Sequence, residues 1–364
     1  MSETKHLRFK NVLCIRADNM GDVLMSTPAF QGLKETFDCK ITLLTSAMGK
    51  LIAPFIKEID DTIIANVPWV KTNDPADEIA FAKLVQTITS RAFDAAFVFT
   101  VYSQNPLPAA MLAFLSGIPV RVAYCRENPY SLLTHWLPDE EPFLFIQHQV
   151  DRDIKLVQSV GASASSQQLS ITFKKEAKQN LVKKLNQTGI DATKPFVIFH
   201  PGASEDKRKY PTELWIEAGK KWLQKQTHPI VITGSLSEAS QAHHIASNIG
   251  GQCVSAAGLF SVEEWIAAID AAQLLVSVNT GTVHIAAALQ KPVVVLYALT
   301  NPQHTPWQTP NKVLYFSVKE ELKSKNEIVR YVAEKVMKQN VPYPTPDEVI
   351  EAIDSLLNHL LSSQ

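Results

Sequence analysis

The chain of 364 residues contains few cysteines, carries almost no net charge and has no long apolar run. Its four cysteines, Cys14, Cys39, Cys125 and Cys253, are widely separated and lack the spacing of metal ligands. We therefore expect reduced thiols, no bound metal and a cytoplasmic location. With 35 basic and 36 acidic residues, the chain as a whole has no electrostatic preference for nucleic acid or for a membrane surface.

Signals for membrane insertion and two common nucleotide-binding motifs are also missing. No segment approaches the ~20 apolar residues of a membrane span, and the first apolar run, residues 12–15, is too short for the core of a signal peptide. The sequence has neither G-x-G-x-x-G nor G-x-x-x-x-G-K-[ST], which argues against a dinucleotide-dependent dehydrogenase and a P-loop NTPase. A D-x-D motif at 151–153 begins an expected helix, where acidic residues are ordinary, and we expect no metal there.

Strand-like and helix-like runs alternate through most of the chain, which is typical of parallel, doubly wound sheets. The length allows about two domains of ordinary size. A stretch rich in serine, alanine and glutamine, residues 162–170, separates two such alternating series. The sequence therefore predicts an α/β protein with Rossmann-like domains at 1–170 and 171–343, followed by a C-terminal helix within 344–364.

Residues 274–296 form the most informative stretch, because they read as a buried strand, a polar turn, a helix of small residues and a second buried strand. The first N–H groups of such a helix are free, and its positive dipole end faces the carboxyl edge of the sheet. A diphosphate is a common occupant of such a site, but a well-capped structural turn explains the pattern equally well. The turn consists of Asn279, Thr280, Gly281 and Thr282.

A second anion-favouring loop follows the expected strand 196–200. It carries three consecutive cations, Lys207, Arg208 and Lys209, shortly after Ser204. A solvated charge run is the usual explanation for such a pattern. Two anion-favouring loops at one sheet edge are better explained by a diphosphate ligand.

Two acidic residues at other strand ends have both a functional and a structural interpretation. Glu238 follows the strand that ends near Thr233 and could accept hydrogen bonds from ribose hydroxyls. Asp22 stands beside Gly21 in the loop after the first strand and could act as a general base. Either carboxylate could instead simply stabilise the start of its helix.

Taken together, these motifs resemble those of glycosyltransferase family 9, the bacterial heptosyltransferases. The resemblance rests on Met-Gly-Asp-Val-Leu at 20–24, His-Pro-Gly-Ala-Ser at 200–204, the loop 234–238 and Asn-Thr-Gly at 279–281 with His284 beyond. Residues 148–152 are similar to the helix that precedes the linker in that family. The motifs occur in the family's order and cover most of the chain.

The resemblance implies a GT-B fold, with two Rossmann-like domains facing each other across a cleft and the last helix packing back toward the first domain. It implies an inverting, metal-independent transferase that moves heptose from ADP-heptose onto the lipopolysaccharide core. The glycolipid acceptor places the enzyme at the cytoplasmic face of the inner membrane, without a transmembrane segment. Neither a cofactor nor a nucleic-acid partner is expected.

Residue roles follow from the resemblance by position. Asp22 would deprotonate the acceptor hydroxyl. Arg16 and Arg152 are assigned to acceptor binding. The residues assigned to the donor are Ser204, Lys207, Arg208, Lys209, Glu238, Asn279, Thr280, Gly281, Thr282 and His284.

The sequence departs from the heptosyltransferase pattern at Asn279, where the family commonly carries aspartate, and at Arg208, where a lysine is usual. The cation is retained, whereas the amide can both donate and accept hydrogen bonds. The sugar that this position contacts is therefore left open. Two alternatives to a transferase stay open: a sugar-nucleotide epimerase of similar fold, and a non-catalytic protein that binds sugar nucleotides.

Overall fold

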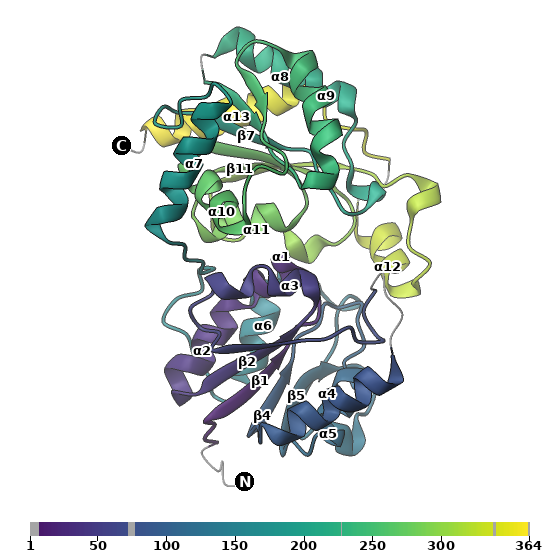
Figure 1. Cartoon of the computed structure of the whole chain (residues 1–364). Coiled ribbons are helices and arrows are strands. Elements are labelled where there is room, and N and C mark those ends of the chain that lie inside the picture. Colours follow the sequence, from purple (N-terminus) through teal and green to yellow (C-terminus); the bar gives the residue numbers. More distant parts are fainter. Residues whose placement is uncertain (1–6, 72–76, 227, 338–339, 363–364) are drawn as a thin grey trace. The chain divides into compact units, whose positions relative to one another are not determined.

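The computed structural model describes residues 7–71, 77–226, 228–337 and 340–362. The chain divides into two compact units, Met1–Ser170 and Ile171–Gln364. Each unit contains one parallel sheet of six strands with helices on both faces (Figure 1). The predicted α/β class with two parallel sheets is confirmed.

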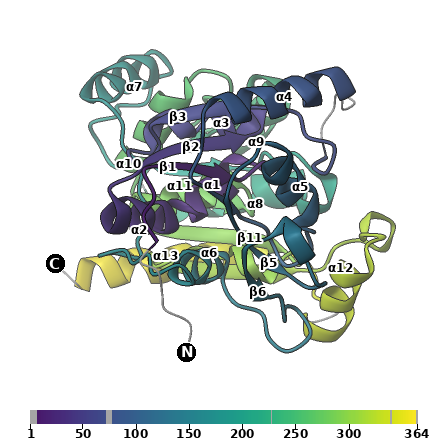
Figure 2. The same ribbon diagram turned by 90° about the horizontal axis from the view of Figure 1, so that it is seen from below.

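The first unit has the strand order β3-β2-β1-β4-β5-β6. Four of the five residues of β1 are buried, as expected for a strand covered by helices on both faces. Figure 2 shows α4 and α6 on opposite sides of these strands. The strands are β1 (Asn11–Ile15), β2 (Lys40–Thr45), β3 (Asp61–Ile64), β4 (Ala95–Val98), β5 (Val120–Cys125) and β6 (His135–Pro138), and the helices are α1 (Met20–Met25), α2 (Thr27–Phe37), α3 (Ala47–Lys50), α4 (Glu78–Ser90), α5 (Leu107–Leu115) and α6 (Gln149–Gln158).

The second unit repeats this arrangement, with the strand order β12-β11-β10-β7-β8-β9. The strands are β7 (Val197–His200), β8 (Ile230–Ile232), β9 (Cys253–Ser255), β10 (Leu274–Val278), β11 (Val293–Ala298) and β12 (Asn311–Phe316). The helices are α7 (Lys175–Gln187), α8 (Thr212–Lys225), α9 (Ala239–Ile249), α10 (Val262–Ala271), α11 (Gly281–Ala288), α12 (Glu327–Tyr331) and α13 (Pro346–Ser362).

Helix α13 packs within the second unit. Val349, Ile350 and Ile353 are buried in the same apolar core as Trp222 of α8, and Lys221 pairs with Asp347 at 2.9 Å. The expected return of this helix to the first unit therefore stays a prediction. None of the helices within the described ranges combines the length and apolarity that crossing a bilayer requires.

In both sheets, successive strands are added toward one edge and then, after one change of direction, toward the other. In the first unit the chain builds β1, β2 and β3 outward and then returns to place β4 on the other side of β1; in the second, β10 is likewise placed beside β7. Ligands of open α/β sheets bind outside the carboxyl ends of the strands at such a switch point. The loops after β1, β4, β7 and β10 are therefore the places where a functional site is expected.

Candidate active site

Arg208 joins the two loops at the switch point of the second unit. Its Nη1 donates to the backbone oxygen of Asn279, which follows β10, at 3.3 Å. Its Nη2 lies 3.1 Å from Glu205 Oε2. The buried Nε has no hydrogen-bond partner among the residues that the structure describes. The guanidinium therefore lies where both loops meet and retains a donor for a further ligand.

The lysines beside Arg208 pair within their own loop. Lys207 Nζ lies 3.2 Å from Glu205 Oε1, and Lys209 Nζ lies 2.7 Å from Asp206 Oδ1. This second contact lowers the pKa of Asp206, chiefly through its hydrogen bond. Ser204 is exposed on the same loop. The three adjacent cations thus differ in their contacts. Within the described part of the chain, only Arg208 of the three forms a hydrogen bond with the loop after β10.

Helix α11 begins directly at the end of this second loop. Thr280 is its N-cap residue, and the Thr280 Oγ1 donates to Thr282 Oγ1 at 3.2 Å. The first backbone bond of the turn runs from Val283 N–H to Thr280 O at 3.1 Å. The N–H groups of Gly281 and Thr282 precede it and lie at the positive end of the helix dipole. His284, one turn in, is only 5% exposed, and its ring lies 6.2 Å from that of His304.

Glu238 lies against the loop after β7. Its Oε2 accepts hydrogen bonds from the N–H of Ser235 at 2.7 Å and from the hydroxyl of Ser235 at 2.8 Å. A Cβ atom at position 202 would lie 2.5 Å from Glu238 Oε1, so a larger residue there would require this carboxylate to shift. Glu238 therefore caps its own short helix, as its structural interpretation predicts, while lying at the carboxyl edge of the sheet.

His200 is a buried member of this edge to which no role was assigned from the sequence, although it begins the His-Pro-Gly-Ala-Ser motif. It ends β7, is 8% exposed, and its Nδ1 lies 2.9 Å from Thr233 Oγ1. Burial lowers the pKa of His200 to about 4, although the nearby charge of Glu238 acts in the opposite direction. The imidazole is therefore neutral at pH 7. Its place at the end of a strand before a Pro-Gly turn was the signal that could have revealed it.

The side chain of Asn279 holds the end of β10 to the end of β11. Its Oδ1 accepts from Ala298 N–H at 3.1 Å. Its Nδ2 donates to Ala298 O at 3.3 Å and to Thr300 Oγ1 at 3.1 Å. The amide is 8% exposed, and both of its ends are used. The expected contact of Asn279 with the donor sugar stays a prediction.

These bonds make the substitution Asn279→Asp informative. A carboxylate keeps the bond from Ala298 N–H but faces the Ala298 carbonyl oxygen without a proton to donate. We expect the free energy of unfolding of the second unit to fall by about 1–3 kcal/mol, together with a changed ranking of donor sugars. Urea denaturation and relative kcat/KM values measure the two effects.

Asn128→Asp is the matched control for this substitution, since the exposed Asn128 accepts from Tyr130 N–H at 3.1 Å, a bond that aspartate preserves. Equal stabilities of the two variants would contradict the bridging role of Asn279. An unchanged donor ranking would mean that its side chain does not affect the sugar.

In the first unit, Asp22 lies in the first turn of α1, next to the end of β1. Its Oδ2 accepts from Asn19 N–H at 3.1 Å, and its Oδ1 lies 3.3 Å from Nη2 of Arg16. The Asp22 side chain is 13% exposed, whereas that of Arg16 is fully buried. Asp22 thus caps its helix and also presents a held carboxylate at the carboxyl edge. Arg16 lies beneath this carboxylate, and its expected role at the acceptor stays a prediction.

A cavity of about 200 Å³ opens at the carboxyl ends of β1 and β4. Asp18 lies in its wall, and the Asp18 Oδ1 accepts from Gln104 Nε2 at 2.6 Å. An indole ring and several neutral polar groups surround the same space, a combination that suits a polyhydroxylated ring. They belong to Trp69, Thr100, Ser103, Gln104 and Asn105.

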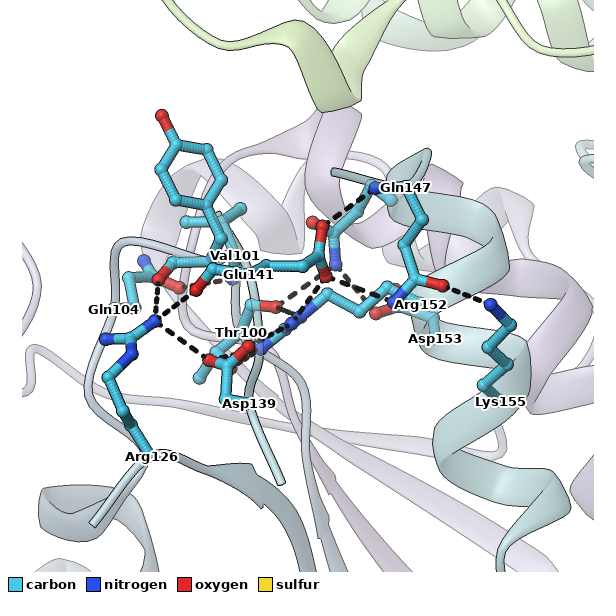
Figure 3. Close-up of polar contacts among 12 residues, drawn as sticks. Thr100, Val101, Gln104, Arg126, Asp139, Glu141, Gln147, Arg152, Asp153 and Lys155 are labelled. Atoms are coloured by element: carbon cyan, nitrogen blue, oxygen red, sulfur yellow. Dashed lines mark hydrogen bonds and ion pairs between the residues drawn. The ribbon is translucent and has the colours of Figure 1, made fainter. Parts of the chain in front are cut away.

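Arg152, also expected at the acceptor, lies in a buried ion network (Figure 3). Its Nη1 lies 2.8 Å from Asp139 Oδ1 and 2.7 Å from Glu141 Oε2. Its Nε donates to Thr100 O at 2.9 Å, and its guanidinium lies 4.2 Å from the centre of the Tyr124 ring. Arg152 is 1% exposed. These contacts give it a structural role, and its role at the acceptor stays a prediction.

The D-x-D motif at 151–153 is not part of a metal-binding cluster among the described residues. Asp153 is buried and accepts from Ser26 Oγ at 2.6 Å and from Gln149 Nε2 at 2.7 Å. Burial is also the chief cause that raises the pKa of Asp153. Across the described ranges, no group of three or more histidine, cysteine, aspartate or glutamate side chains is placed to hold a metal ion.

Comparison with known proteins identifies the family. The model of "Glycosyltransferase family 9 (heptosyltransferase)" matches residues 81–334. The chain belongs to glycosyltransferase family 9. Lipopolysaccharide heptosyltransferase 2 of Escherichia coli K12 is 23% identical over 311 residues, with 81% of this chain and 84% of that protein covered. The recognition made from the sequence motifs is thereby confirmed.

Solved structures of similar proteins share the fold of this glycosyltransferase. A family 9 glycosyltransferase from Veillonella parvula superimposes with a TM-score of 0.77 at 18% identity, covering 98% of this chain and all of that one. E. coli heptosyltransferase WaaC with ADP gives a TM-score of 0.63 at 18% identity, covering 96% and 98%. The predicted GT-B fold is confirmed, and the chain is a glycosyltransferase.

Proposed function

We propose that this family 9 glycosyltransferase is an inverting heptosyltransferase that uses ADP-heptose and acts on a lipopolysaccharide core or a related surface glycolipid. The observation that carries the donor assignment is the contact between Arg208 and the backbone oxygen of Asn279. It brings a cation and the start of α11 to one switch point, where a diphosphate is bound by charge and by backbone N–H groups. The names of the relatives support heptose and ADP.

The proposed reaction is a direct displacement at the anomeric carbon. The acceptor oxygen forms a bond to that carbon while the bond from the carbon to the diphosphate oxygen breaks, which inverts the configuration. The proton of the acceptor hydroxyl passes to Asp22, and the electron pair leaves with ADP. Arg208 and the N–H groups of Gly281 and Thr282 stabilise the charge on the departing diphosphate.

The first unit supports the acceptor assignment. The cavity beside Asp18 combines Trp69 with hydroxyl and amide groups, and no lysine or arginine lines it among the described residues. Such a site favours a neutral sugar ring over a phosphate. A glycolipid acceptor would bring the enzyme to the membrane surface as a peripheral protein.

The test is a panel of nucleotide sugars incubated with the purified protein and a core-glycolipid acceptor. We expect transfer from ADP-heptose and a rise in melting temperature with ADP-containing ligands, because a ligand that binds the folded state stabilises it. Interconversion of the sugar without transfer would identify an epimerase. Stabilisation without either reaction would identify a binding protein.

The substitution Arg208→Ala tests the donor site. We expect it to weaken binding of ADP and of the donor together by about 1.5–3 kcal/mol, the value of a charge-assisted hydrogen bond to a phosphate. Lys209→Ala is the control, since its ammonium is half exposed and pairs with Asp206. Calorimetric titration with ADP measures both variants. Equal losses would mean that the loop acts only as a diffuse patch of positive charge.

A further inference from the structure

Arg16 lies between two carboxylates at the carboxyl edge of the first unit. The guanidinium is fully buried, with Nη2 at 3.3 Å from Asp22 Oδ1 and Nε at 3.6 Å from Asp18 Oδ2. Asp22 is the base of the proposed function, whereas that function gives Asp18 no role in proton transfer. One buried cation is thus shared by the proposed base and a second acid.

Asp18 is held in place from two other segments. Gln104, in the loop after β4, donates from Nε2 to Asp18 Oδ1 at 2.6 Å. The other end of this amide accepts from Val101 N–H at 3.1 Å, which fixes its orientation. Ser46 Oγ, before α3, donates to the backbone oxygen of Asp18 at 2.5 Å. The Asp18 carboxyl therefore cannot turn away from Arg16 without losing the bond from Gln104, while the bond from Ser46 holds the Asp18 backbone.

The charges around Asp18 come from three elements. Burial is the largest influence and raises the pKa of Asp18 to about 6. Arg16 on its own loop and the hydrogen bond from Gln104 act to lower it, while Asp22 on α1 and Asp153 on α6 act to raise it. Asp18 therefore loses its proton at a pH of about 6. The negative charge that it then carries acts on Asp22, the other carboxylate that contacts Arg16.

We propose that Asp18 is a positioning residue that sets the proton affinity of Asp22 through the buried Arg16 that both carboxylates share. The inference rests on the proposed role of Asp22 as the base. A neighbouring cation opposes protonation of a carboxylate, and a second carboxylate on the same cation relieves that effect. When Asp18 is ionised, Asp22 is a stronger base; when Asp18 holds a proton, the charge of Arg16 is offset only by Asp22 and the buried Asp153.

The consequence is a rise in kcat as the pH increases through about 6, the pH at which Asp18 loses its proton. In Asp18→Asn, no carboxylate at position 18 offsets the charge of Arg16 at any pH, and Asp153 and Asp22 are the acids that remain beside it. We expect this variant to lose the rise near that pH and to have a plateau kcat about three- to tenfold lower, because the rate falls with the strength of the base. Its affinity for ADP should be unchanged, since the donor loops lie in the other unit.

The experiment combines kcat–pH profiles with carbon NMR titration of labelled aspartate carboxyls in the full-length protein, with Asp151→Asn as the control. In Asp18→Asn we expect the Asp22 carboxyl to titrate about one pH unit lower than in the wild type. Gln104→Ala is a second variant that keeps both carboxylates. Because it removes a hydrogen bond to ionised Asp18, we expect its kcat rise to move to higher pH.

The inference is overturned if Asp22 titrates at the same pH in the wild type and in Asp18→Asn. It is also overturned if kcat rises at the same pH in Gln104→Ala as in the wild type. An absence of sugar transfer by the wild type would instead overturn the proposed function. In that case the titration of Asp22, which needs no substrate, still decides whether Asp18 controls it.

Discussion

Asp22→Asn lowers the turnover of the enzyme by about 100- to 10,000-fold, the contribution of a general base, while affinity for ADP stays within a few-fold. The asparagine oxygen can still accept from Asn19 N–H or from Arg16, the two groups that hold the Asp22 carboxylate. The variant therefore keeps one of these two contacts at the start of α1, and it loses both the charge that pairs with Arg16 and the ability to take a proton. Steady-state turnover at saturating donor and acceptor, with calorimetric titration of ADP, measures the two quantities.

Asp151→Asn is the matched control for this prediction. Asp151 is also an acidic residue in the first turn of a helix, α6, so its loss reports what removing such a carboxylate does to the fold. We expect its turnover to match that of the wild type. If Asp22→Asn keeps more than about a tenth of wild-type turnover, Asp22 is not the base.

The second unit becomes less stable on acidification because of His200. The pKa of this buried imidazole is about 4, whereas that of an unfolded histidine is about 6.5. Between these values the unfolded chain binds the proton more strongly, so stability is complete above pH 6.5 and falls as the pH decreases toward about 4. The loss reaches about 2 kcal/mol at pH 5.

Hydrogen exchange of amides in β7 and β8 measures this loss, because it reports the opening free energy of the second unit separately. We compare the wild type with His200→Asn, which can still bond to Thr233 but does not titrate. The difference in opening free energy between the wild type and His200→Asn should shrink by about 2 kcal/mol from pH 7.5 to pH 5. His243→Asn, at an exposed position of α9, should follow the wild type. A constant difference would show that His200 is protonated in the folded protein.

Much of the fold could be predicted because each strand carries its own signal. The apolar runs of β1, β10 and β11 are buried almost throughout, and a strand covered on both faces needs such a run. The anion-favouring loops could be found for a similar reason, since cations and a helix start are local features. The family resemblance then supplied the substrate class.

The partners of the buried polar residues could not be predicted, because they come from distant segments. Arg152 was assigned to the acceptor, but its carboxylate partners lie 13 and 11 residues earlier in the chain. Asn279 was assigned to the sugar, and its bonds reach 19 residues forward to Ala298. His200 was assigned no role of its own, because only the packed sheet brings Thr233 to it. Spacing in the sequence predicts elements, whereas these contacts depend on the tertiary arrangement.

The Arg152 network also constrains the order in which the first unit can assemble. Its hydrogen bonds connect α6 with Thr100, 52 residues earlier, and with the segment after β6. Contacts between such distant positions form late in folding, because the intervening chain must first be closed into loops. Until α6 docks, Asp139 and Glu141 lack the guanidinium of Arg152, and Asp139 keeps only the longer ion pair with Arg126 at 3.4 Å. Incomplete pairing of a buried charge is costly. The edge of the sheet at β6 and helix α6 should therefore form and dissolve together as one cooperative block.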